Sequence, residues 1–140
     1  MEVKIAETQL EKDDAFYVRK IVFIDEQQVP EELELDEHDK TAIHFVGYEE
    51  KRLVAAARLR FVDGYGKLER ICVLKEHRGK HYGKILMEAM EKTIREHGVD
   101  KAKLNAQTHA ESFYSKQGYE TVSDIFMDAG IPHVTMVKKL

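Results

Sequence analysis

A short basic turn, Arg78-Gly79-Lys80-His81-Tyr82-Gly83-Lys84, is the part of this chain best suited to binding an anion. It joins an expected strand, Lys67–Val73, to an expected long amphipathic helix. The first N–H groups of a helix have no intrahelical acceptor, and the positive end of the helix dipole lies beside them. The two glycines let the backbone approach a phosphate without an intervening Cβ, and the Arg and Lys side chains add positive charge. The turn therefore predicts a site for a phosphorylated cofactor.

Other phosphate and metal motifs do not fit this turn. A Walker loop needs Gly at Arg78 and Ser or Thr at Ile85, so the hydroxyl with which that motif holds magnesium is missing. A dinucleotide fingerprint needs G-x-G-x-x-G early in a βαβ unit, whereas this turn begins with Arg and lies mid-chain. His77 and His81 are four residues apart, but Arg78 occupies the Glu position of H-E-x-x-H and no third ligand is evident. We therefore expect no metal site.

The composition is that of one ordinary globular domain. The chain has 140 residues, 43% hydrophobic and 34% charged, which suits a single substantial core over residues 1–140. A net charge of −4 argues against a nucleic-acid-binding protein. The single cysteine, Cys72, excludes an intrachain disulfide and suits a reducing compartment. With no signal peptide and no apolar run long enough for a membrane, we expect a cytoplasmic protein.

Apolar periodicity and turn residues predict the order β-α-β-β-β-α-β-α-β-β, and hence an α/β protein with a mixed, mostly antiparallel sheet and helices on both faces. Strands are expected at Val3–Ala6, Ile43–Tyr48, Leu53–Phe61, Lys67–Val73, Lys101–Gln107, Tyr119–Val122 and His133–Lys138. Helices are expected at Leu10–Phe23, from the basic turn to Gly98, and at Ala110–Gln117. The acidic segment Asp25–Lys40 is expected to be irregular. Its Glu31–Asp39 cluster is interpreted as a solvated surface, with attraction of a polyamine or lysine-like acceptor as a weaker alternative.

The basic turn resembles the pyrophosphate loop of the GNAT superfamily of N-acetyltransferases, R/Q-x-x-G-x-G/A. Arg78 and Gly83 match, and His81 stands at the middle glycine, where its backbone N–H can still donate. Downstream, Ala110-Glu111-Ser112-Phe113-Tyr114-Ser115-Lys116-Gln117-Gly118-Tyr119 resembles the family's A-x-x-F-Y-x-x-x-G-[FY] helix. The two motifs occur in the family's order and at its spacing.

Two further segments resemble one branch of the family. Arg19–Gln27 and Gly130–His133 are similar to the ElaA/YjcF-like branch of small bacterial GNAT proteins. The resemblance covers nearly the whole chain and implies a single-domain GNAT fold. It also implies acetyl-CoA as co-substrate and direct transfer of its acetyl group to an amine.

The resemblance implies a role for the strand that precedes the basic turn. In GNAT folds this strand splays away from the next parallel strand, so the main chain of Ile71, Cys72 and Val73 is expected to pair with the pantetheine arm. Gln107 stands where many members have Asn, and its carboxamide offers both a donor and an acceptor. The N–H of Cys72 or Val73 would stabilise the oxyanion. The Cys72 side chain is expected to be a small buried hydrophobe rather than an acetyl carrier.

Two side chains are candidates for the proton transfers. Tyr114 occupies the family's usual general-acid position, where its hydroxyl would protonate the departing thiolate, and simple packing is the alternative. Glu69 is the first candidate for the base that takes the proton of the amine, with His133 behind it. Glu69 is equally suited to pairing with Arg70 or Arg58 across the sheet.

Two functions of different classes follow from the sequence. One is an enzyme that acetylates a small-molecule or protein amine, and the other is a CoA-binding sensor or interaction module with little catalysis. The full motif around Tyr114 favours the enzyme, whereas the substitution at His81 favours the sensor. The sequence names neither the acceptor nor the choice between monomer and homodimer.

Overall fold

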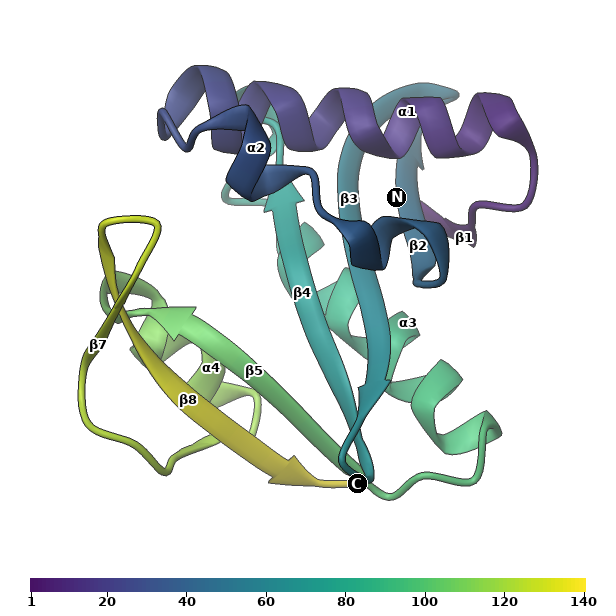
Figure 1. The fold of residues 1–140 in the computed structure, drawn as a ribbon. Coiled ribbons are helices and arrows are strands. Elements are labelled where there is room, and N and C mark those ends of the chain that lie inside the picture. The colour runs from purple at the N-terminus through teal and green to yellow at the C-terminus, as the bar shows by residue number, and fades with distance from the viewer.

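A twisted mixed sheet runs through the molecule and carries helices on both faces (Figure 1), and the computed structural model describes all of residues 1–140. The strands are β1 (Glu2–Ile5), β2 (Ile43–Glu49), β3 (Arg52–Val62), β4 (Tyr65–Val73), β5 (Lys101–Gln107), β6 (Glu120–Thr121), β7 (Phe126–Asp128) and β8 (Ile131–Lys139). Their order is β1-β2-β3-β4-β5-β8-β6, with β7 also paired to β8. Only β4 and β5 are parallel neighbours, so the expected mostly antiparallel sheet is confirmed.

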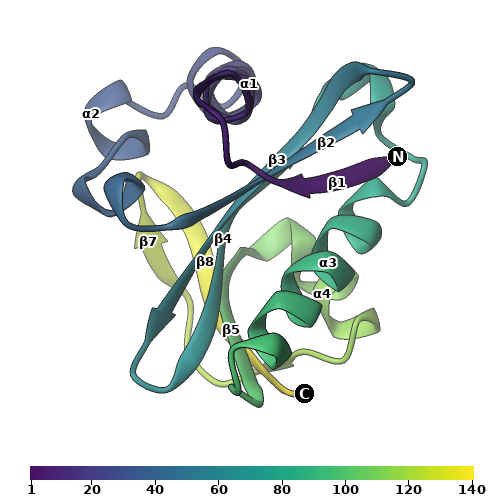
Figure 2. The same cartoon turned by 90° about the vertical axis from the view of Figure 1, so that its right-hand side faces the viewer.

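The helices are α1 (Gln9–Arg19), α2 (Glu31–Glu34), α3 (Tyr82–Glu96) and α4 (Glu111–Lys116), and α1 continues into a π-helical turn, η1 (Lys20–Glu26). Short 3₁₀ turns are η2 (Glu37–Lys40), η3 (Lys75–His77) and η4 (Thr108–Ala110). A capping box fixes the start of α1, because Thr8 Oγ1 accepts from Glu11 N–H at 3.1 Å and the Glu11 carboxylate accepts from Thr8 N–H at 3.1 Å. Figure 2 shows α1 on one side of the sheet and α3 with α4 on the other.

Two apolar clusters hold the layers together. The larger lies between α3 and the sheet, where the 3–4 spacing of α3 buries Leu86, Met90 and Ile94 completely. Burying each such side chain contributes about 1.5–3 kcal/mol. The smaller lies under α1 and contains Val18 and Cys72. Cys72 is buried among these apolar side chains, so the prediction of a small buried hydrophobe is confirmed, and this burial raises the pKa of its thiol to about 12.

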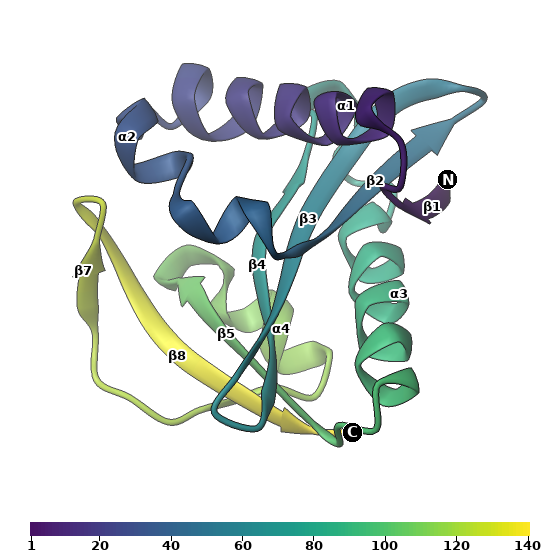
Figure 3. The same cartoon turned by 45° about the vertical axis from the view of Figure 1, so that its right-hand side comes forward.

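The acidic segment between α1 and β2 is not irregular as expected, and its solvated surface is interrupted: Glu31, Glu32 and Glu37 are exposed, whereas Glu34 is buried. It forms α2 and η2, which lie above β4 and the β7–β8 hairpin in the view of Figure 3. Glu34 is buried because the wholly buried Arg19 donates through Nε to Glu34 Oε1 at 2.8 Å and through Nη1 to Asp39 Oδ1 at 2.8 Å. Burying a charge requires a paired partner, and these partners lie 15 and 20 residues away. No local pattern shows such a pairing.

Strand β7 was also missed by the sequence reasoning. It pairs with β8 from Phe126↔His133 to Asp128↔Ile131, so β8 begins at Ile131, two residues before the expected start. Ala129 (φ 51°) and Gly130 (φ 75°) make the turn between the two strands, and both adopt the positive φ that favours a tight hairpin. None of the helices is long and apolar enough to cross a membrane.

Candidate active site

The parallel pair β4–β5 separates partway along its length. The Cα partners end at Leu68↔Leu104, although β4 continues to Val73 and β5 to Gln107. Figure 1 shows the two strands diverging as a V. This is the splay that the family resemblance implied. It leaves the facing main-chain groups of the diverging segments without a partner strand.

A β-bulge bends β4 at this point. Arg70 and Ile71 lie together opposite the single residue Ala57 on β3. Arg70 adopts φ 56°, a left-handed conformation that costs a residue with a Cβ about 1–2 kcal/mol. Backbone strain of this kind persists where the surrounding structure enforces it, and it is concentrated at functional sites.

The hydrogen bonds to β3 show which β4 amide faces the splay. Leu74 N–H donates to Val54 O at 2.9 Å, and an antiparallel ladder alternates its hydrogen-bonded pairs. Cys72 therefore turns its main chain toward β3, whereas Val73 turns away from it. The Val73 carbonyl accepts instead from Arg78 Nε at 3.0 Å. Of the two N–H groups suggested for the oxyanion, that of Val73 is the one available, and Cys72 is engaged in the ladder.

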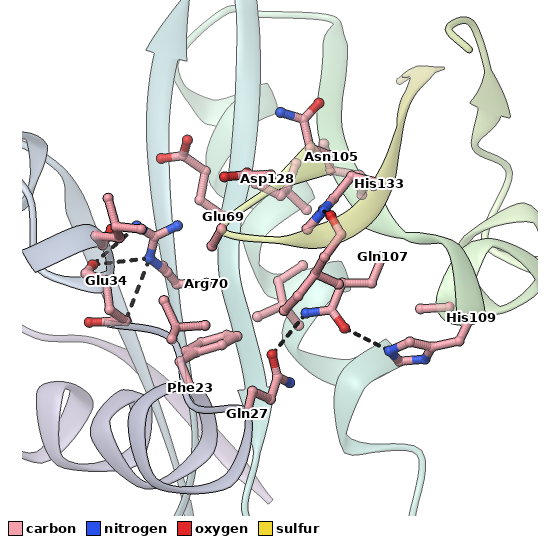
Figure 4. Close-up of a pocket in the computed structure, with 18 of the residues that line it drawn as sticks. Phe23, Gln27, Glu34, Glu69, Arg70, Asn105, Gln107, His109, Asp128 and His133 are labelled. Atoms are coloured by element: carbon pink, nitrogen blue, oxygen red, sulfur yellow. Dashed lines mark hydrogen bonds and ion pairs between the residues drawn. The ribbon is translucent and has the colours of Figure 1, made fainter. Parts of the chain in front are cut away.

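A pocket of about 380 Å³ occupies the splay (Figure 4). Its walls come from the η1–α2 segment, β4, β5, the η4–α4 segment and the β7–β8 hairpin. The predicted site residues that line it are Glu69, Ile71, Gln107, Tyr114 and His133. These residues are up to 64 positions apart in the chain, and the splay brings them to one cavity.

Tyr114 lines this pocket, and its hydroxyl makes no hydrogen bond to the protein. Its half-buried ring packs edge-on against Phe113 at 5.1 Å and Tyr119 at 6.3 Å between centroids, which fixes its direction. Burial raises the pKa of Tyr114 to about 12, so the phenol is protonated at neutral pH. A fixed, unpaired and protonated hydroxyl is suited to proton donation. Its catalytic role stays a prediction.

Glu69 is held by three cations. Its carboxylate lies 2.9 Å from Arg58 Nη2, 2.8 Å from Arg60 Nε and 3.3 Å from Lys67 Nζ. Burial would raise the pKa of this carboxyl, but these hydrogen bonds and charges outweigh it and lower the pKa to about 2. Such a carboxylate is a weak proton acceptor. The structure therefore does not favour Glu69 as the base, and it shows the alternative pairing with Arg58 across the sheet.

His133, the second candidate for the base, is oriented to accept a proton. Its Nδ1 lies 2.7 Å from the Ile131 carbonyl oxygen. A carbonyl can only accept, so in the neutral ring Nδ1 carries the hydrogen and Nε2 keeps its lone pair. Phe126 stacks on the imidazole at 6.0 Å between centroids and fixes the plane of the ring. His133 is thus better placed than Glu69 to take a proton in this pocket.

The N-terminus of α3 presents free main-chain donors. The first main-chain hydrogen bond of this helix runs from Ile85 N–H to His81 O at 3.2 Å, and no side chain caps the helix. The N–H groups of Tyr82, Gly83 and Lys84 therefore have no acceptor in the protein. This is the arrangement expected for a phosphate cradle.

Three positions of the loop are glycine in this chain or in the family pattern, and the structure gives a different reason at each. His81 adopts φ 63°, a conformation favouring glycine, which explains the glycine at this place in the family pattern. Gly79 has φ 82°, and a Cβ there would contact nothing. Gly83 differs, because a Cβ on it would lie 3.2 Å from Phe113 Cζ. Its glycine therefore allows α3 to approach α4, and the close approach of a phosphate to Gly83 stays a prediction.

Acidic side chains already bind the loop cations. Arg78 forms a two-pronged ion pair with Glu26, at 2.7 and 2.8 Å. Lys80 lies 3.5 Å from Glu49, whereas Lys84 is exposed and has no such partner. The main-chain N–H groups, more than these side chains, are the loop's available donors.

Gln107 links β5 to the turn after η1. Its Nε2 donates to Gln27 Oε1 at 2.9 Å, and its Oε1 lies 2.6 Å from His109 Nε2 (Figure 4). Gln27 and His109 therefore fix the orientation of this carboxamide, which lines the pocket.

Comparison with known proteins agrees with this geometry. Residues 8–140 match the family model described as "Acetyltransferase (GNAT) domain". The chain belongs to the GNAT family. YjcF of Bacillus subtilis, called an uncharacterized N-acetyltransferase, is 50% identical over 139 residues, covering 99% of each protein. The crystal structure of Escherichia coli ElaA is similar with a TM-score of 0.89 at 27% identity, covering 99% of this chain and 100% of that one. The expected ElaA/YjcF-like branch is confirmed.

A more distant structure supports the fold. An aminoglycoside 6'-N-acetyltransferase complexed with coenzyme A has a TM-score of 0.76 at 15% identity, covering 99% of this chain and 97% of that one. The single-domain GNAT fold is thus confirmed. The enzyme class expected from the sequence, an N-acetyltransferase, is also confirmed by the family match.

Proposed function

We propose that this GNAT protein transfers an acetyl group from acetyl-CoA to a primary amine by direct attack in a ternary complex. One observation carries the proposal: the splay of β4 from β5 opens a pocket at which the Tyr114 hydroxyl has no protein partner. A protonated group with no structural partner is available for transfer chemistry. The same pocket is lined by His133, whose free nitrogen is an acceptor.

The residues present fit a CoA-type co-substrate. The free amides of Tyr82, Gly83 and Lys84 suit a pyrophosphate at the start of α3. The main chain of Val73 and the carboxamide of Gln107 offer polar partners for the amides of a pantetheine arm. A protein of the same fold in complex with coenzyme A supports this assignment. Acetyl-CoA supplies the activated acetyl group as a thioester.

In the proposed reaction, His133 Nε2 takes one proton from the ammonium before its nitrogen bonds to the acetyl carbon. The second proton that the nitrogen loses replaces the one that Tyr114 gives to sulfur. The Val73 N–H donates to the carbonyl oxygen while negative charge develops there. The carbon–sulfur bond then breaks, and Tyr114 gives its proton to the departing sulfur. We do not assign Glu69 a proton-transfer role, because the ion pairs that lower its pKa to about 2 also make it a poor acceptor.

The Tyr114→Phe variant tests this function. Removing the hydroxyl leaves the ring packing intact, so acetyl-CoA affinity should stay unchanged while turnover falls about 10²-fold, the lower end for a positioned general acid. Turnover is measured as CoA thiol released, with the acetylated amine confirmed by mass spectrometry, at saturating acetyl-CoA. Tyr17→Phe is the matched control, because Tyr17 is exposed and makes no hydrogen bond.

Unchanged turnover in Tyr114→Phe would reduce Tyr114 to a packing residue. A wild-type protein that binds acetyl-CoA but releases no thiol with any amine would instead be the CoA-binding module left open by the sequence.

A further inference from the structure

The β4 wall of the pocket carries an arginine with donors to spare. Arg70 lines the pocket, and it donates through Nη2 to the carbonyl oxygens of Leu33 at 3.2 Å and Glu34 at 3.1 Å. Its Nη2 also reaches Asp36 Oδ2 at 3.3 Å. No protein atom accepts from Nη1. Arg70 therefore caps the end of α2 with one side of its guanidinium and keeps the other side open.

The charge around Arg70 is not balanced. The ion-pair network that joins α1, α2, η2, β3 and β4 contains five cations (Arg19, Arg58, Arg60, Lys67, Arg70) and four carboxylates (Glu34, Asp36, Asp39, Glu69). Burial and the charges of Arg58 and Arg19 lower the pKa of Arg70. One more anion beside Arg70 would balance the network. Arg70 also lies in the β-bulge of β4 and has the strained φ of 56°, so the bulge and this side chain occur at the same wall of the pocket.

The opposite wall is acidic. On the β7–β8 hairpin, Phe126 pairs with His133 and Asp128 with Ile131, so the alternation of strands puts all four side chains on one face. Asp128 lines the pocket on this face and makes no hydrogen bond or ion pair with the protein. Figure 4 shows Asp128 and His133 coming from the hairpin and Arg70 and Glu34 from the other side of the pocket. The free carboxylate is thus next to the proposed base.

We propose that the acceptor is a small zwitterion that carries a primary amine and a carboxylate. Asp128 binds its ammonium group beside His133, and Arg70 Nη1 binds its carboxylate across the pocket. This inference rests on the proposed acetyl transfer and names its acceptor class. A volume of about 380 Å³ suits a free amino acid or a similar amino carboxylate. A lysine side chain of a protein has the amine but no carboxylate for Arg70, so it fits the pocket less well.

Matched acceptors test the inference. Glycine, β-alanine and γ-aminobutyrate vary the distance between amine and carboxylate, and the carboxamide of each removes the charge alone. We expect the best acid to exceed its amide at least tenfold in kcat/KM for the wild type. Arg70→Gln should abolish this ratio, and Arg70→Lys should restore part of it. Arg60→Gln is the control, because Arg60 belongs to the same ion-pair network through Glu69 but does not line the pocket.

The acidic wall has its own test. Asp128→Asn should raise KM about tenfold for acid and amide alike, with little change in kcat, because the ammonium is common to both. Asp128 is exposed and unpaired, so this variant should fold normally. Equal kcat/KM for every acid and its amide in the wild type would overturn the inference. An Arg70→Gln variant that loses both activities equally would overturn it too, because this would indicate a structural role alone.

Calorimetry separates this inference from the proposed function. Each acid and its amide are titrated into wild type and Arg70→Gln in the presence of CoA. If no amine is acetylated but an acid binds more tightly than its amide only when Arg70 is present, the reaction is wrong and the zwitterion site stands. If that difference in binding is absent as well, the inference fails together with the reaction.

Discussion

His81 shows how one residue can be strained and still be compatible with a site. Its φ of 63° costs the folded protein about 1–2 kcal/mol. A glycine would remove this strain, but its greater flexibility in the unfolded chain would cancel part of the gain. His81→Gly should therefore raise the free energy of unfolding by about 0.5–1 kcal/mol and keep acetyl-CoA affinity equal or slightly better. Urea unfolding and calorimetry measure the two quantities.

The His81→Ala variant is the control, since it keeps the Cβ and removes the imidazole. It should match the wild type in stability within about 0.5 kcal/mol. A drop of acetyl-CoA affinity in both variants would show that the imidazole contacts the phosphate, contrary to the backbone-donor interpretation.

The sequence identified individual site residues better than it ranked their roles. Tyr114 and Gln107 were found because they stand in a family motif or at the end of a clear strand, and both line the pocket. The sequence placed Glu69 before His133 as the base, because it does not show that strand pairing brings Arg58 and Arg60 beside the Glu69 carboxylate. Asp128 was missed entirely, since an exposed carboxylate in a turn region carries no signal without the hairpin that positions it.

At the scale of elements, α3 and α4 meet through Gly83. A Cβ at this position would lie 3.2 Å from Phe113 Cζ, tighter than ordinary contact. Gly83→Val should therefore displace α4 and with it Tyr114, so turnover should fall at least tenfold and by more than acetyl-CoA affinity does. Steady-state kinetics and calorimetry on the same protein compare the two losses.

The double variant Gly83→Val/Phe113→Leu provides the control, because leucine removes the ring atom that the valine would meet and keeps an apolar side chain against Tyr114. Recovery of most of the lost turnover would confirm helix approach as the cause. If the double variant is no better than Gly83→Val, and acetyl-CoA affinity falls as much as turnover, the valine clashes with the phosphate instead.

Most helices and strands were predictable because apolar spacing and glycine turns are local signals. The exceptions are β7 and the segment that forms α2 and η2. Strand β7 has only three residues, two of them exposed, so it shows no period. The acidic segment looked solvated because the arginines that bury its carboxylates lie on α1 and β3, and sequence reasoning had no means to pair them.

For the whole molecule, the buried ion pairs determine how stability depends on pH. Burial would raise the pKa of Asp39 and Glu69, but their arginine partners lower both to about 2. Their contribution is complete above the unfolded-state pKa of about 4 and is lost as pH falls through about 2. We expect the urea midpoint to be steady from pH 8 to 5 and to fall between pH 4.5 and 2, with up to about 2–3 kcal/mol lost per carboxylate.

Asp39→Asn tests the source of this dependence. At pH 7 the variant should be less stable by about 3–5 kcal/mol, because Arg19 and Arg58 lose a buried partner, and its acid-limb slope should be shallower. An acid limb identical to that of the wild type would assign the pH dependence to other carboxylates.

The burial of the single cysteine has a practical consequence for all of these measurements. A thiol-reactive dye needs an exposed thiolate. Cys72 is buried, and its pKa is raised to about 12, so its thiol stays protonated at neutral pH. The folded protein should be silent to such a dye, so the colour that develops in an assay reports the sulfur of released CoA. The same burial prevents folded copies from cross-linking through disulfides, and any dimer seen without reductant is held by non-covalent contacts.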